Sequence, residues 1–232
     1  MDNNIRVQDI QIVQEQQRFM VKVYGWMAFA LATTGIVATT VASSQSMLEM
    51  IIGNKMIFFG LFIVQILMVG ALSIWVQKLS SLAVMGIFVA YAALTGLTFS
   101  FIFLIYTSES IASTFFITAG TFAVMSFFGL FTGTDLTKFG SIMMMGLIGL
   151  VIASLVNMFM QNETIYWITT YAGVLIFTGL IAYDTQRIKD MHLAGADGTE
   201  EGKKLAVMGA LKLYLDFINL FLMLLRLFGR RK

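Results

Sequence analysis

The sequence predicts an all-α integral membrane protein with seven transmembrane helices. Of its 232 residues, 58% are hydrophobic and only 12% are charged, whereas soluble domains carry about 25% charged residues. Six runs contain no Asp, Glu, Lys, Arg or His, and each is long enough to cross a hydrocarbon core, which needs about 20 apolar residues. These runs cover residues 23–48, 56–77, 79–108, 110–134, 139–162 and 164–183. A seventh apolar stretch precedes the C-terminus and differs from the others because it contains charged residues.

The short connections between the runs predict one helical bundle without a soluble domain. We expect residues 1–22 to form a cytoplasmic segment, residues 23–228 to form a single transmembrane domain, and residues 229–232 to form a basic tail. The protein would then be a multi-pass protein of the plasma membrane, with the lipid bilayer as its main partner.

The distribution of Lys and Arg predicts a cytoplasmic N-terminus, because basic residues near span ends concentrate on the cytoplasmic side. In this orientation the inner segments hold Arg6, Arg18, Lys22, Lys78, Lys138, Arg187, Lys189, Lys203 and Lys204. The outer loops hold only Lys55, but the basic tail would also lie outside after a seventh full crossing. A re-entrant last segment is the alternative that would keep this tail inside.

Composition excludes several classes of chemistry. Without Cys the chain cannot form disulfides, iron–sulfur sites or thiol redox centres, and the single His192 cannot assemble a zinc site alone. A bound metal would need oxygen ligands. The formal charge of +2 comes from basic residues at span boundaries, so we expect no nucleic-acid partner. No pattern indicates a catalytic residue or a cofactor.

Asp216 is the most informative residue, because an ionisable group inside a membrane span is costly and is by default a functional-site candidate. At about 100° per residue, Lys212, Asp216, Asn219 and Arg226 share one face of the last segment. This polar stripe should face a cavity or a partner rather than acyl chains. The simpler alternative is that Lys212 and Asp216, four residues apart, only neutralise each other.

Asp184 is the second candidate, at the inner end of the sixth run. Its simpler interpretation is an interfacial ion pair or cap with Arg187, three residues later. One loop joins the last two spans, however, so they can be neighbours. If Lys212 extends to the inner interface, Asp216 lies about 5 Å deeper, and Asp184 could meet it.

A pair of carboxylates has a definite chemistry. Two carboxylates within a few ångströms cannot both ionise cheaply, so the pair should take up a proton and act as a pH sensor. Without that proton, Asp184 and Asp216 would offer up to four oxygens to Ca²⁺, which takes six to eight ligands. We therefore expect weak Ca²⁺ binding at these two residues, which suits passage better than storage.

Two stretches near the C-terminus have a distinctive sequence: TGLIAYDTQRIK at residues 178–189, and ALKLYLDFINLF at residues 210–221, followed by LLR at residues 224–226. They resemble the signature of the Bax inhibitor-1 family, the transmembrane Bax inhibitor motif proteins, in its bacterial branch. The resemblance extends over nearly the whole chain in the number and spacing of the spans. It implies a bacterial inner-membrane protein in which the last of seven helices is central and wrapped by the other six.

The resemblance also implies a pH-sensitive calcium leak, in which Asp184 and Asp216 alternate between a hydrogen-bonded closed arrangement and a separated open one. It favours a full seventh crossing. Some bacterial members carry a glutamate inside the second span and an arginine near its cytoplasmic end, where this chain has Gln65 and, less closely, Gln77 and Lys78. A gating salt bridge to Asp184 would need Lys78 or Arg187 instead, and Gln65 is better suited to hydrogen bonds between helices.

Two other functions remain as alternatives. A regulator that binds another membrane protein, such as a membrane protease or a stress-response partner, is also compatible with the family resemblance. An intramembrane aspartyl protease would likewise need two membrane aspartates. That hypothesis is the weakest, because Asp216 lacks the Gly-x-Gly context of such enzymes and the chain has no Pro for their Pro-Ala-Leu motif.

Overall fold

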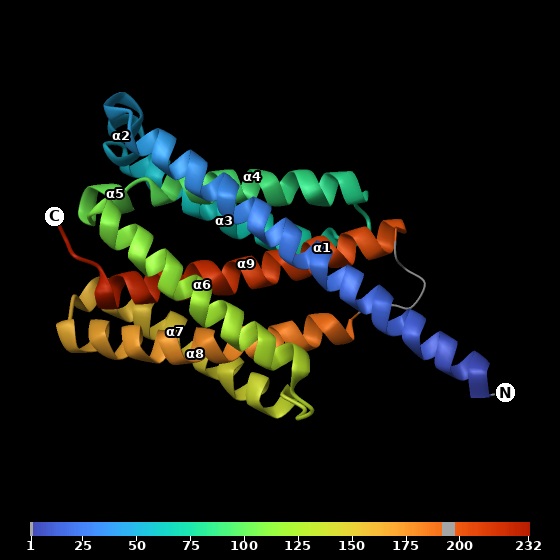
Figure 1. Cartoon of the computed structure of the whole chain (residues 1–232). Helices are drawn as coiled ribbons and strands as arrows, with labels where there is room; N and C mark the ends of the chain where they lie inside the picture. Colours follow the sequence, from blue (N-terminus) through green and yellow to red (C-terminus); the bar gives the residue numbers. More distant parts are fainter. Residues whose placement is uncertain (1, 192–197) are drawn as a thin grey trace. The chain divides into compact units, whose positions relative to one another are not determined.

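The computed structural model describes residues 2–191 and 198–232, so His192 lies outside the described residues. The described chain is helical throughout, with one isolated β-bridge between Tyr106 and Arg231 (Figure 1). The helices are α1 (Asp2–Ala42), α2 (Gln45–Ile52), α3 (Lys55–Trp75), α4 (Ser81–Phe99), α5 (Ile102–Ile105), α6 (Ser108–Phe131), α7 (Thr137–Met160), α8 (Glu163–Asp190) and α9 (Glu200–Phe228).

The predicted apolar runs all form helices. Within the described residues, six segments are long and apolar enough to cross a membrane: one in α1, one over α4 and α5, and α6, α7, α8 and α9. The 21-residue helix α3 is also apolar. At 1.5 Å per residue it is about 31 Å long, close to the thickness of a hydrocarbon core. The chain is therefore an all-helical, multi-pass membrane protein.

The N-terminal segment continues directly into the first predicted span. Helix α1 has 41 residues and no interruption, which corresponds to about 60 Å, roughly twice the hydrocarbon thickness. Part of α1 must therefore extend beyond the apolar layer.

The third predicted span is not a single helix, because α4 ends at Phe99 and the short helix α5 follows. Thr98 Oγ1 donates to the carbonyl of Thr95 at 2.9 Å, and Ser100 Oγ donates to that of Leu97 at 2.7 Å. These bonds lie where α4 ends, and bonds of this kind can bend a helix.

The chain forms two compact units. Of the residues that the structure describes, the first comprises 2–105, 191 and 198–211. In it α4 packs against both α1 and α3, and the carboxylate of Glu200 at the start of α9 accepts hydrogen bonds from the backbone N–H and hydroxyl of Ser81 at 2.9 and 2.8 Å. Gly96 of α4 lies so close to the backbone of Thr34 in α1 that an added Cβ would collide with it.

The second unit comprises residues 106–190 and 212–232. Helix α8 packs against both α6 and α7. The later part of α9 joins them through Phe217, whose ring centroid lies 5.4 Å from that of Phe115 and 5.7 Å from that of Phe122. Met223 of α9 fits against Gly173 of α8.

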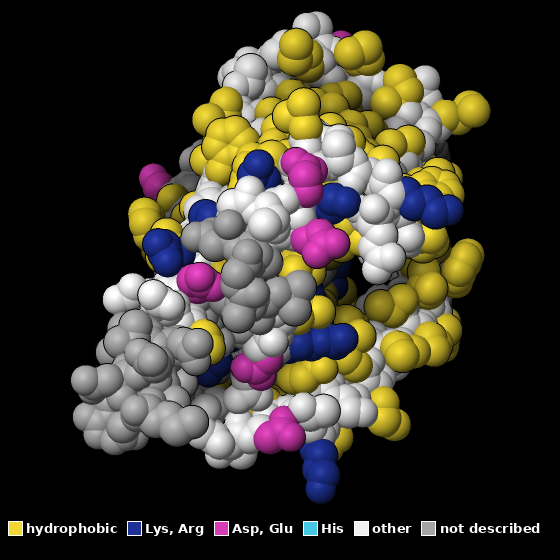
Figure 2. Space-filling view, turned by 90° about the vertical axis from the view of Figure 1, so that its right-hand side faces the viewer, with side chains coloured by type: hydrophobic (Ala, Val, Ile, Leu, Met, Phe, Trp, Pro, Cys, Tyr) yellow, Lys and Arg dark blue, Asp and Glu magenta, His cyan; other side chains and the backbone are white. Residues whose placement is uncertain are grey.

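The surfaces of the second unit suit contact with lipid. Helix α7 is the least buried of the candidate spans. Of the 18-residue apolar segment in each span, 11% is buried in α7 and 67% in α9. Side chains such as Phe159 (81% exposed) and Phe116 (73% exposed) would be unfavourable in water. Figure 2 shows that charged as well as hydrophobic side chains are exposed on the face that it draws.

Candidate functional site

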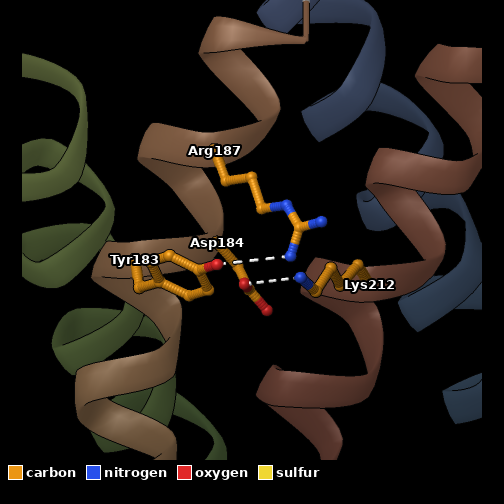
Figure 3. Close-up of polar contacts among 4 residues, drawn as sticks. All are labelled: Tyr183, Asp184, Arg187 and Lys212. Carbon is orange, nitrogen blue, oxygen red and sulfur yellow. Dashed lines mark hydrogen bonds and ion pairs between the residues drawn. The ribbon is translucent and has the colours of Figure 1, made fainter. Parts of the chain in front are cut away.

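An ion pair joins α8 and α9 inside the second unit. Lys212 Nζ lies 2.7 Å from Asp184 Oδ1 (Figure 3). The side chain of Asp184 is 2% exposed and that of Lys212 is 36% exposed. Lys212 therefore does not extend freely to the interface, and its close ionic partner is Asp184 on the neighbouring helix rather than Asp216 on its own.

Asp216 completes a cluster of three ionisable groups. It is 6% exposed, and its carboxyl interacts with that of Asp184 both by charge and at hydrogen-bonding range. Its Oδ2 atom is buried and has no hydrogen-bond partner among the described residues. Two carboxylates share no proton when both are ionised, so this contact becomes a hydrogen bond only when one of them is protonated. The structure thus brings together the two aspartates that the sequence singled out.

Tyr183 and Arg187 border the cluster on the α8 side. Arg187 Nη1 donates to Tyr183 Oη at 3.2 Å, and Lys212 Nζ lies 5.6 Å from the centroid of the Tyr183 ring (Figure 3). Arg187 acts on Asp184 by charge without a direct ion pair. The predicted ion pair between Asp184 and Arg187 is therefore not formed. Asp184 pairs with Lys212 instead, and Arg187 is hydrogen-bonded to Tyr183.

Close packing fixes this part of α8. Gly129 of α6 lies against the backbone of Ala182, and Gly140 of α7 lies against the ring of Tyr183, so that an added Cβ at either glycine would collide. The hydroxyls of Ser126 and Thr185 are 2.8 Å apart and link α6 to α8. Small residues thus let three helices approach closely around Asp184, as is common in membranes.

The C-terminal end of α8 also binds the connection between α6 and α7 through hydrogen bonds. Gln186 accepts a hydrogen bond from the backbone N–H of Leu136 and donates one to the carbonyl of Thr134, both at 2.9 Å. Lys189 Nζ donates to the carbonyl of Leu130 at 2.9 Å. These bonds hold the α8 segment that carries Asp184 in place.

The other predicted site residues have different surroundings. Asn219 donates to the carbonyl of Leu215 in its own helix at 2.8 Å. Arg226 lies at the far end of the stripe, with its Cζ atom 5.6 Å from the centroid of the Tyr166 ring. The stripe therefore meets α8 at two separate places, and only Lys212 and Asp216 reach Asp184.

The two remaining gating candidates belong to the first unit. Gln65 of α3 is buried and bridges to α4, with Nε2 at 3.4 Å from Thr98 Oγ1 and Oε1 accepting from Thr95 Oγ1 at 3.4 Å. This is the inter-helix bridging role expected for the amide. Lys78 lies in the turn after α3, and its gating role stays a prediction.

The donor set at the cluster suits only weak binding of a hard cation. No group of three or more acidic or imidazole side chains able to hold a metal occurs in the part of the chain that the structure describes. A Ca²⁺ ion at Asp184 and Asp216 would have to take most of its six to eight oxygen ligands from water and carbonyls, in competition with Lys212.

Sequence reasoning missed Tyr183 as a neighbour of the charged groups. A signal was present: Tyr183 and Arg187 are four residues apart and must share a helix face. The position of Gly140 beneath the ring had no such signal, because it depends on how α7 packs on α8.

Comparison with known proteins identifies the family. Residues 16–232 match the family model described as inhibitor of apoptosis-promoting Bax1. The chain belongs to the Bax inhibitor-1 family. An inner membrane protein of Escherichia coli, YbhL, is 48% identical over 217 residues, which are 93% of each chain. An uncharacterised protein of Borreliella burgdorferi is 45% identical over 229 residues, 96% of this chain and 99% of the relative. An uncharacterised protein of Rickettsia prowazekii is 44% identical over 221 residues, 93% of this chain and 91% of the relative.

Membership of the Bax inhibitor-1 family confirms the resemblance that the sequence showed. The matched region contains the whole of α8 and α9, and so it includes Asp184, Lys212 and Asp216. These three residues form the candidate site.

Proposed function

We propose that this protein is a pH-sensitive calcium leak channel gated by protonation of Asp184 and Asp216. The observation that carries the proposal is the contact of these two buried carboxyl groups on neighbouring membrane helices. Charged groups at this depth are expensive, and they usually mark an ion or proton path.

The mechanism follows from the charge of the cluster. Asp184, Asp216 and Lys212 together carry one net negative charge when all three are ionised, and one added proton makes the cluster neutral. With the proton, the two carboxyls can share a hydrogen bond and stay together, which is the closed arrangement. Without it they repel each other, and their separation opens an anionic route that attracts Ca²⁺.

Lys212 and Arg187 set the response of the cluster. The Lys212 ammonium neutralises one of the two carboxylates, so a single proton is enough to close the path. Arg187 contributes positive charge from the same helix as Asp184, and its hydrogen bond to Tyr183 keeps it beside the cluster.

The proposed topology has seven crossings with α9 at the centre. The 29 residues of α9 form one uninterrupted helix, about 43 Å long, which favours a full crossing over a re-entrant segment. The buried share of its apolar segment, 67%, is the largest among the candidate spans, as expected for a helix wrapped by others. The N-terminus is cytoplasmic by the distribution of basic residues, and the inner membrane is the proposed location because YbhL is described as an inner membrane protein.

An aspartyl protease is disfavoured by the same geometry, and we propose no enzymatic activity. A protease dyad needs both carboxyls directed at one water, sharing a proton. Here the ammonium of Lys212 lies 2.7 Å from Asp184 Oδ1 and forms an ion pair with that carboxylate. Binding to another membrane protein remains the alternative function, and it predicts a partner that co-purifies equally well with Asp184→Ala and Asp216→Ala variants.

Purified protein in vesicles tests the channel directly. Vesicles loaded with a Ca²⁺ indicator should fill faster with the protein than without it, and faster at pH 8 than at pH 6. Filling at the rate of protein-free vesicles at both pH values would refute the channel.

A further inference from the structure

A hollow at the opposite end of the second unit from the candidate site collects two arginines. It has a volume of about 690 Å³ and lies between the end of α7, the start of α8 and the end of α9. Arg226 and Arg231 both line it, together with one carboxylate, Glu163. The charged lining therefore has a net positive charge, and the N-terminus of α8 adds partial positive charge.

Neither arginine has a carboxylate partner among the residues that the structure describes. Arg226 is placed by the face of Tyr166, 5.6 Å from its Cζ atom. Arg231 forms an isolated backbone bridge with Tyr106, and the neighbouring phenol groups of Tyr106 and Tyr166 raise the pKa of its guanidinium. Aromatic and phenolic partners hold a guanidinium in place without neutralising it, so both charges stay available to an anion.

Hydrogen bonds hold two segments that line the hollow or adjoin it. The backbone N–H of Arg230 donates to Ser110 Oγ at 2.9 Å, and its carbonyl accepts from the N–H of Thr107 at 3.1 Å, which holds the C-terminal tail. In the turn between α7 and α8, Asn157 Oδ1 accepts from the N–H of Asn162 at 2.8 Å. These bonds are made within the chain and need no ligand.

The apolar part of the lining favours a lipid. Trp167, Met158 and Leu227 line the same hollow, and Trp167 is 36% exposed. Tryptophan is enriched where membrane proteins meet lipid headgroups. Arginine often binds phosphate groups, because its planar guanidinium can donate hydrogen bonds to two phosphate oxygens at once.

We propose that this hollow binds a phosphate-class anion, supplied by the headgroup of an anionic phospholipid in the leaflet at which α8 begins. In the proposed orientation this is the outer leaflet. The site is independent of the aspartate cluster, so its failure would leave the channel proposal intact.

Quenching of Trp167 fluorescence by brominated lipids tests the proposal. The chain has three tryptophans, and a full-length background with Trp26→Phe and Trp75→Phe leaves Trp167 alone. In detergent micelles at low salt, brominated phosphatidylglycerol should quench Trp167 at several-fold lower concentration than brominated phosphatidylcholine with the same acyl chains.

Variants that remove one charge each should change the lipid preference in a defined pattern. Arg226→Gln and Arg231→Gln should each raise the half-quenching concentration of phosphatidylglycerol about fivefold, the effect of one basic residue at a membrane surface. Glu163→Gln should lower it. Lys138→Gln removes an exposed charge from the other end of α7 and should change nothing. Arg231 lies in the exposed tail, so its variant tests the site even if Arg226→Gln fails to fold.

Two results would overturn the site: equal quenching by the two lipids, or a preference for phosphatidylglycerol that survives in both arginine variants. Inorganic phosphate distinguishes the sources of the anion. If millimolar phosphate has no effect on quenching, the phospholipid is the occupant. If it competes in an arginine-dependent way, the anion site stands but its occupant can be a soluble anion.

Discussion

Lys212 Nζ lies 2.7 Å from Asp184 Oδ1 and thereby links the two helices that carry the candidate aspartates. The contact has two consequences. It supplies a counter-charge for a carboxylate that is 2% exposed, and it leaves the neighbouring Asp216 without a cation of its own at close range.

Removing the cation should change the pH response of the channel. In Lys212→Met the unprotonated cluster would carry two negative charges instead of one, so protonation would be favoured up to higher pH. We expect the pH midpoint of Ca²⁺ flux into vesicles to move upward by at least half a unit. Lys138→Met, an exposed lysine of the same unit, should leave the midpoint in place. A midpoint that moves equally in both variants would point to a general charge effect.

The ion pair between Lys212 and Asp184 should be visible as an energetic coupling. Asp184→Asn and Lys212→Met should each destabilise the protein, and the double variant should lose less than the sum of the two. Because Lys212 is 36% exposed, solvent screens the pair, and we expect a coupling of about 1 kcal/mol, at the lower end for contacting residues. Denaturant unfolding of the four proteins in detergent measures it. Additive losses would show that the pair contributes no coupling in solution.

The close approach of α6 to α8 should make Gly129 intolerant of a side chain. A Cβ there would collide with the backbone of Ala182, which cannot move as a side chain can, and overpacking costs about 1–3 kcal/mol. Gly120 is a matched control in the same helix, because an added Cβ meets nothing within 4 Å. Thermal unfolding should show a loss for Gly129→Ala, and no loss or a small gain for Gly120→Ala. Equal effects would contradict the packing at Ala182.

Asp135, outside the cluster, should make the stability of the protein depend on pH in the acidic range. It lies in the connection before α7, where hydrogen bonds from the Thr137 hydroxyl and backbone N–H lower the pKa of its carboxyl. A lowered folded pKa gives stability that is present above the unfolded pKa of about 3.9 and disappears as the pH falls through the folded value. The thermal stabilities of the natural chain and Asp135→Asn should therefore differ at neutral pH and converge below about pH 4. A difference that changes between pH 5 and 8 would contradict this assignment.

The sequence predicted the spans and the aspartate pair for clear physical reasons. Uncharged runs of 20 or more residues have few alternatives to membrane helices, and a single loop between the last two spans makes Asp184 and Asp216 possible neighbours. Periodicity also placed Lys212 and Asp216 on one face.

The rest depended on details that a sequence pattern does not contain. Whether Lys212 pairs within its helix or across to Asp184 depends on the distance between α8 and α9, which the periodicity of one helix does not contain. The same stripe geometry could not show that Arg226 meets Tyr166 instead of the aspartates. The sequence also did not predict the break after Phe99, which lies inside an uncharged run without Pro.

The pH profile of Ca²⁺ flux in vesicles, measured for the natural chain and for Asp184→Asn, Asp216→Asn and Asp135→Asn, tests the central claim most directly. The natural chain and Asp135→Asn should both conduct faster as the pH rises from 6 to 8. Asp184→Asn and Asp216→Asn should lose most of that dependence, because a single carboxylate has no partner with which to share a proton. An unchanged pH profile in both cluster variants would contradict gating by the aspartate pair.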